Sequence, residues 1–224
     1  MTAADNTGGF YGEAGDLYTM FQCLIRDARR LAAREKTEGS DVYKSMWTLV
    51  YNLYAHYMVV RSFYPLCKIR GRIIGECGMT DPDIQETMME GVDMSTRAWF
   101  VTMCGFGFEK IIVEIAKRND IKHDRLNIKP KFKGVLDKFK LTSDERLNLV
   151  DIFYHTRNTL HDGGVVSSDE TFKYRGRKFE FTSNGVMRHA DWGSLIFLAE
   201  EIIRMLDAII ESETASNEAA HDTV

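Results

Sequence analysis

Cysteine and proline are both scarce in this chain of 224 residues. The four cysteines, at positions 23, 67, 77 and 104, form no CxxC pair, so the sequence predicts neither a disulfide framework nor a cysteine-rich zinc site. This usage favours a reducing cytosol and a cytoplasmic protein. With prolines only at positions 65, 82 and 130, long helices can form almost anywhere.

Long apolar runs and an excess of positive charge are missing as well. No apolar stretch reaches the roughly 18 residues of a membrane-spanning helix, and the N-terminal sequence TAADNTGG lacks the basic-then-apolar pattern of a signal peptide. We therefore expect neither membrane insertion nor export. The formal net charge of −4 argues against non-specific wrapping of nucleic acid.

One basic segment departs from this average charge. Between Lys117 and Lys140 there are nine Lys or Arg residues against three Asp, a local balance of +6, so the rest of the chain carries −10. Phe132 and Phe139 are interleaved with these cations. The segment can bind phosphates, or it can be a solvated basic connection with a short helix, and both interpretations stay open.

Apolar periodicity predicts an all-α fold, a bundle of about five to six helices. Because 44% of the residues are hydrophobic, the chain can bury a substantial core in one domain, residues 1–212. Residues 213–224 are expected to form a polar, disordered tail. The helices are predicted at about 11–36, 41–63, 82–117, 144–161 and from 192 onward, with starts at Asp41, Asp81-Pro82, Ser143 and Asp191. The glycines at 71, 75 and 78 leave residues 67–80 undecided between a short helix and a loop.

A small β-hairpin is predicted at about 171–182, before the last helix. The sequence TFKYRGRKFEF alternates aromatic and polar residues around Arg175-Gly176, and Asn184-Gly185 predicts a turn after it. The hairpin can contact a substrate or cover the bundle.

The helix predicted from residue 82 carries an acidic residue among apolar ones. Trp99, Met103 and Phe106 are expected in the core, and Gly105 and Gly107 weaken the helix locally. Glu109 follows, and a carboxylate there needs a partner if it is buried. We expect it either to pair at the surface with Lys110 or Lys117, or to pair with a buried arginine, for which Arg157 is the candidate.

The stretch RNTLHDGG, residues 157–164, ends the helix predicted over 144–161. Arg157 and His161 are four residues apart, so their side chains share one helix face about 6 Å apart, where a phosphate can bridge them. A guanidinium and an imidazole are the groups that cleave RNA without a metal: a cation for the phosphoryl charge and a proton donor or acceptor. The alternative is a last turn in which cations interact with the helix dipole and Gly163 or Gly164 terminates the helix.

This helix has two stripes with apolar residues, of which the second is apolar at one end and strongly polar at the other. One contains Leu149, Phe153 and Leu160; the other contains Leu147, Val150, Tyr154, Arg157 and His161. A helix apolar on two faces is either central in its bundle or contacts a second protein. Tyr154 either lines the Arg157 face or packs as a core aromatic. His155 points away from that face and is expected to be solvated or capped.

The motif Arg-Asn-x-x-His at the end of a late helix in an all-α chain resembles the HEPN superfamily. Members commonly have four to six residues between Arg and His, whereas this chain has three, which resembles the subset reading RN-x-x-H followed by Asn or Asp and Gly. The run RAWFVTMCGFGFEKII, residues 97–112, resembles the earlier HEPN helix in which small and aromatic residues precede an acidic residue, here Glu109. The resemblance covers about residues 40–212.

This resemblance implies a metal-independent endoribonuclease that acts as a homodimer, with the two motifs meeting in one composite cleft and leaving a cyclic phosphate end. Many relatives belong to toxin–antitoxin or anti-phage systems, which implies RNA as substrate and an antitoxin or defence protein as a partner. Other relatives are non-catalytic modules that bind RNA, nucleotides or proteins. No cofactor and no metal are implied.

The residue roles follow the same resemblance. His161 is the expected general acid or base, Arg157 stabilises the transition-state charge, and Asn158 orients the phosphate or the partner motif. The expected substrate-binding or supporting residues are Tyr154, Glu109, Lys131 and Lys133.

Overall fold

The chain forms an all-α bundle with one small β-hairpin, as the sequence predicted. The computed structural model describes residues 14–68, 78, 81–122, 128–161, 165–166, 168–183, 185 and 190–221. The helices and strands are α1 (Ala14–Arg34), α2 (Asp41–Lys68), α4 (Pro82–Arg118), α5 (Ile128–Lys138), α6 (Asp144–His161), β1 (Glu170–Tyr174), β2 (Arg177–Phe181) and α7 (Trp192–His221). The undecided stretch 67–80 lies mostly outside the described residues.

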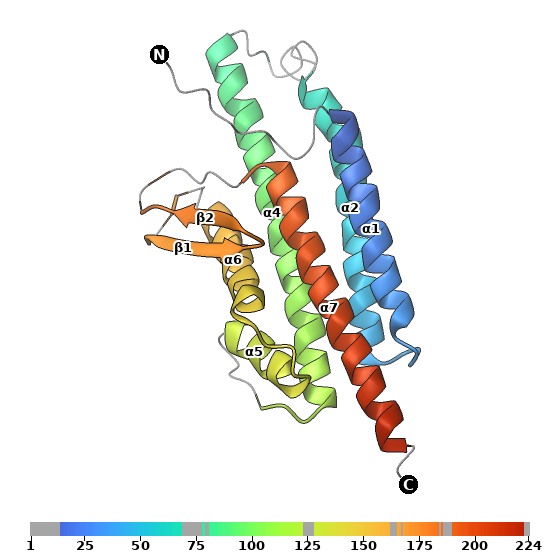
Figure 1. The fold of residues 1–224 in the computed structure, drawn as a ribbon. Coiled ribbons are helices and arrows are strands. Elements are labelled where there is room, and N and C mark those ends of the chain that lie inside the picture. Colours follow the sequence, from blue (N-terminus) through green and yellow to red (C-terminus); the bar gives the residue numbers. More distant parts are fainter. Residues whose placement is uncertain are drawn as a thin grey trace.

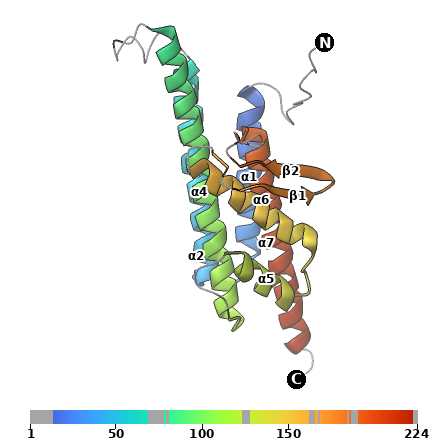
Figure 2. The same cartoon turned by 90° about the vertical axis from the view of Figure 1, so that its left-hand side faces the viewer.

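Four long helices, α1, α2, α4 and α7, run side by side, and α5 and α6 pack against one flank of α4 (Figure 1). The hairpin packs on α6, on the side away from α4 in the view turned by 90° (Figure 2). The first turns of α4 extend beyond the other helices in both views. None of the helices in the described ranges combines the length and apolar content that crossing a membrane requires.

Helix starts lie where the capping residues predicted them. The Asp81 carboxylate accepts hydrogen bonds from the backbone N–H groups of Asp83, at 2.9 Å, and Ile84, and Pro82 follows it at the first helical position. The Ser143 hydroxyl accepts one from the N–H of Arg146 at 3.2 Å and so caps α6. These local signals confirm the predicted beginnings of α4 and α6.

Two helices are longer than predicted. α2 continues past Pro65 to Lys68, because a proline removes one backbone hydrogen bond without forcing the chain to leave the helix. α7 continues to His221, so the prediction of a disordered tail from residue 213 is wrong for these residues. Glu213 is 4% exposed and binds Arg118, and this contact extends the packed part of α7 beyond its apolar stripe.

The hairpin covers α6 and α7 instead of standing free. Its two-residue turn has positive φ at both Arg175 (46°) and Gly176 (73°), the geometry typical of a tight hairpin. The Tyr174 hydroxyl donates to the buried carboxylate of Glu201 on α7. His155 of α6 is half-buried, with its ring centroid 5.2 Å from that of Phe172, so it packs against the hairpin and is solvated only in part.

A buried histidine stands at the centre of an aromatic cluster. His56 of α2 is 0% exposed and contacts Phe21 of α1, Trp99 and Phe100 of α4 and Trp192 of α7, with its centroid 4.6 Å from that of Trp99. Neither imidazole nitrogen has a hydrogen-bond partner among the described residues. Burial lowers the pKa of His56 from 6.5 to about 4, because a charged imidazole is poorly solvated there.

This burial predicts a stability loss in acid. The unfolded chain binds a proton at His56 below pH 6.5 and the folded chain only below about 4. The free energy of unfolding is therefore undiminished above pH 6.5 and is expected to fall by about 3 kcal/mol as the pH drops to 4. Urea unfolding across this range should show His56→Phe losing less stability than the wild type. The control Tyr57→Phe, a change in the same core, should follow the wild-type profile, and parallel profiles for all three proteins would contradict the prediction.

Candidate functional site

The motif residues lie on the last two turns of α6, which pack against the middle of the long helix α4. α6 packs against α4, α5, α7 and β1, and Val150 and Tyr154 are buried at these contacts. The apolar part of this second stripe is thus buried within the chain. The central position of α6 in the bundle therefore explains why the helix is apolar on two faces. At the end of the helix, Arg157 is half-buried, whereas Asn158 and His161 are exposed.

Arg157 packs against α4. Its guanidinium carbon is 4.9 Å from the ring centroid of Phe106 and 5.9 Å from that of Tyr154. Gly105 makes this approach possible, since a Cβ there would lie 3.0 Å from Cδ and 3.3 Å from Nε of Arg157. The Nε of Arg157 is buried, and no described residue accepts its hydrogen.

Tyr154 is a core residue that also contacts the motif. It is 7% exposed, and its hydroxyl donates to the carbonyl oxygen of Gly105 at 3.1 Å. Burial raises the pKa of Tyr154, the charge of Glu109 raises it further, and Arg157 acts in the opposite direction. Tyr154 therefore packs as a core aromatic, and its ring also lies beside Arg157.

Glu109 pairs with a residue that the sequence did not suggest for it. Its carboxylate lies 2.6 Å from Nζ of Lys131 on α5. Neither expected arrangement, with Lys110 or Lys117 at the surface or with Arg157 inside, is observed among the described residues. A second ion pair, Lys129 Nζ to Asp151 at 2.6 Å, joins α5 to α6. Glu109 and Lys131 therefore hold α5 beside the motif.

The basic segment from Lys117 to Lys140 is largely paired with carboxylates. Lys131 has a side chain only 5% exposed, so its ammonium faces Glu109 and not solvent. Lys133 is exposed and pairs with Asp137 at 2.6 Å. Ion pairs also take up Lys117, Arg118 and Lys129. Ion pairing thus reduces the capacity of this segment to act as a continuous phosphate-binding surface.

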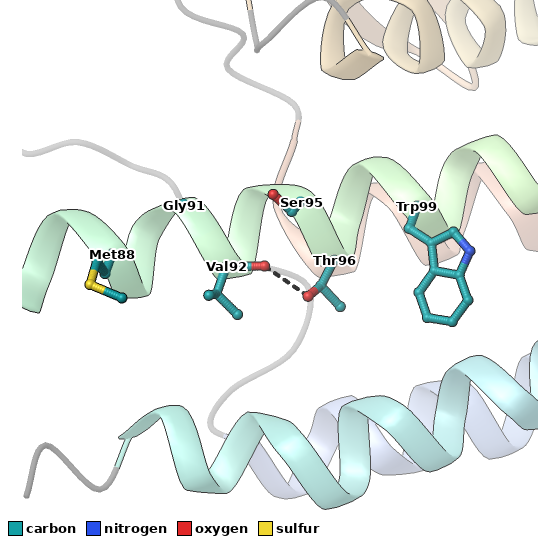
Figure 3. A pocket seen from close by; sticks show the side chains of 6 residues that line it. All are labelled: Met88, Gly91, Val92, Ser95, Thr96 and Trp99. Carbon is teal, nitrogen blue, oxygen red and sulfur yellow. Dashed lines mark hydrogen bonds between the residues drawn. The ribbon is translucent and has the colours of Figure 1, made fainter. Parts of the chain in front are cut away.

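One face of α4 exposes apolar side chains. The stripe, with Ile84, Met88 and Trp99 exposed and Val92 and Met103 half-buried, recurs at helical spacing and has no charged member. It includes a surface depression of about 460 Å³ lined by Met88, Gly91, Val92, Ser95, Thr96 and Trp99. Met88, Val92, Thr96 and Trp99 point to the same side of α4 (Figure 3). We call this face the α4 stripe.

Phe106 continues the direction of the α4 stripe towards the motif. It is 18 residues, or five helical turns, beyond Met88 and is 59% exposed. The prediction that Phe106 and Trp99 lie in the core is wrong, because these side chains are 59% and 42% exposed. The described elements cover this face of α4 only in part, with His56 of α2 against Trp99 and Arg157 of α6 against Phe106. Sequence reasoning thus missed Phe106 as a neighbour of Arg157. The signal was present in its flanking glycines, since Gly105 and Gly107 mark close approaches of α4 to Arg157 and to Leu49.

Arg157 and Tyr154 are in contact, Asn158 and His161 lie on the same last turns of α6, and Glu109 and Lys131 form an ion pair. Lys133 joins only its own helix neighbour, Asp137. Within the described ranges, no three His, Cys, Asp or Glu side chains gather in a way that could hold a metal ion. Comparisons with protein-family models, curated proteins and solved structures found no match.

Proposed function

We propose that this protein is a metal-independent endoribonuclease of the HEPN type that acts as a homodimer. One observation carries the proposal: the guanidinium of Arg157 is held on an aromatic ring at the surface, beside the exposed Asn158 and His161. It forms no ion pair with a described carboxylate, so its charge is available to an anion. The resemblance of RNTLH to the HEPN motif points to the phosphates of RNA as that anion.

The three side chains supply what internal cleavage of RNA requires. The 2′-hydroxyl attacks the adjacent phosphorus, the bond to the 5′ oxygen breaks, and the products carry a 2′,3′-cyclic phosphate and a 5′-hydroxyl. His161 takes the proton from the attacking hydroxyl or gives one to the leaving oxygen. Arg157 stabilises the charge that builds on the phosphoryl oxygens, and Asn158 orients the phosphate or the partner motif.

The α4 stripe supports the homodimer. An uncharged apolar face over several turns is unfavourable in water and is typical of a surface that a partner buries. The stripe leads along α4 to Phe106 and Arg157, so a second copy bound there would bring two motifs close to each other. A role in toxin–antitoxin or anti-phage defence, with an antitoxin or defence protein as partner, belongs to the same proposal.

A second candidate is a non-catalytic HEPN-like module that binds RNA, a nucleotide or a protein. The ion pairs of Lys129, Lys131 and Lys133 favour it, because they weaken the electrostatic attraction that a nuclease uses to collect its substrate.

The two candidates differ in one assay. We expect the purified full chain, incubated with a mixed RNA pool in EDTA, to produce internal cuts with 2′,3′-cyclic phosphate ends, detected by sequencing the fragments with and without removal of that phosphate. Light scattering should give about twice the monomer mass of 25.7 kDa. An uncut pool would reject the nuclease and leave the binding module, and a monomeric mass would reject the composite site.

A further inference from the structure

Phe106 is an exposed aromatic ring in the middle of a bundle helix. It exposes 59% of its surface, while its neighbours Gly105, Gly107 and Phe108 are all buried. Burying an aromatic ring is favourable, and the exposed part of the Phe106 ring does not gain this free energy. A ligand or partner that covers the ring would recover that free energy.

The contact between Phe106 and Arg157 determines how the guanidinium is presented. The ring centroid lies 4.9 Å from the guanidinium carbon, and Gly105 lets the arginine approach α4 closely. Nε of Arg157 is buried with no acceptor among the described residues, so the outer Nη groups are the ones left to bind an anion. Two N–H groups of a guanidinium can bind two oxygens of one phosphate.

We infer that Phe106 is a stacking platform for a nucleobase next to the phosphate bound by Arg157, so the site takes single-stranded RNA. The inference rests on the proposed function, since it takes RNA as the ligand of Arg157. Phosphate and base are covalently linked, so a strand held at Arg157 brings a base to the adjoining ring. In a duplex the bases are already stacked on each other, whereas in a single strand every base offers a face to an aromatic side chain.

Binding can be measured without cleavage. A short single-stranded RNA with a 2′-O-methyl group on every sugar has no attacking hydroxyl, and a matched strand of abasic sugars has the same phosphates without bases. We expect the wild type to bind the base-bearing strand about tenfold more tightly than the abasic strand or the same sequence in a duplex. Phe106→Leu should lose this preference, and Phe106→Trp should restore it. Tyr51→Leu, a matched change of an aromatic that is 65% exposed on α2, should leave it intact.

Each outcome separates the inference from the nuclease proposal. Equal preference for bases in the wild type and Phe106→Leu overturns the platform, even if the wild type cuts RNA in EDTA. A Phe106→Leu protein that loses both the preference and the dimer mass also overturns it, because Phe106 is then a subunit contact. A preference that depends on Phe106, in a protein that cuts no RNA, supports the platform while the nuclease function fails. Since the preference compares two ligands on one protein, a lower folded fraction does not change it.

Discussion

Replacing His161 by alanine is expected to lower the rate of RNA cleavage by a factor of about 10² to 10⁴, the usual contribution of a positioned acid or base. His161 is exposed on the last turn of α6, so the alanine variant should keep the buried core, which a thermal unfolding curve would check. Single-turnover rates on one RNA identified from the pool would measure the loss. Because the proposal assigns proton transfer to His161 and phosphate binding to Arg157, the loss should appear in the chemical step and not in RNA affinity.

Two further variants sharpen this expectation. His155→Gln changes a histidine on the same helix that packs against Phe172 of the hairpin, so cleavage should continue. Arg157→Lys keeps the charge but loses the planar fork and its stacking on Phe106, and we expect at least about a tenfold loss. If His161→Ala cuts RNA at the wild-type rate, His161 is neither the acid nor the base and the proposed mechanism fails.

Replacing Arg118 by methionine is expected to lower the free energy of unfolding by about 3 kcal/mol. Arg118 ends α4 between two carboxylates that are almost fully buried, Glu35 after α1 and Glu213 on α7. Its Nη1 lies 2.8 Å from Glu35, its Nε lies 2.9 Å from Glu213, and Nη2 binds Glu213 as well. Without the guanidinium, both carboxylates would stay in the protein interior with less compensation.

The buried position of these carboxylates separates this ion pair from surface pairs. Arg34→Met is the matched control, because Arg34 pairs with Asp207 at 2.7 Å but is 48% exposed, and its loss should cost at most about 1 kcal/mol. Adding Glu35→Gln and Glu213→Gln to Arg118→Met should recover part of the stability by removing the buried charges. Urea unfolding of these proteins would show it. Equal losses for the Arg118 and Arg34 variants would mean that the cluster contributes no more than a surface pair.

Local signals were sufficient for the helix starts and for the helix that carries Arg157 and His161. Asp81-Pro82 and Ser143 predicted the beginnings of α4 and α6 because a capping hydrogen bond spans only two or three residues. The positive φ values of Arg175 and Gly176 fit the predicted hairpin for the same reason. Helix-breaking residues predicted helix ends less well. Pro65 did not end α2, because the other hydrogen bonds of the helix compensate for the one that proline removes.

Long-range pairing was beyond the reach of sequence patterns. Glu109 had nearer candidates along its own helix, yet it pairs with Lys131, which is 22 residues away in the chain. The same holds for Glu213. Its position in a polar stretch predicted disorder, but it is ordered in α7, where it binds Arg118 of α4. Charged side chains are long and flexible, so their partners depend on which helices become neighbours.

The sequence by itself determined the all-α fold, the hairpin before the last helix, and the placement of Arg157 and His161 on one face of α6, since each follows from the periods and caps of single elements. Only the tertiary structure decided that Arg157 rests on Phe106, that Phe106 and Trp99 stay partly exposed, and that Lys131 is buried. A helix pattern predicts which residues share a face, but the neighbours that dock on the helix decide which face is covered. On α4, the described elements cover the face that leads to Arg157 only in part, through His56 at Trp99 and Arg157 at Phe106.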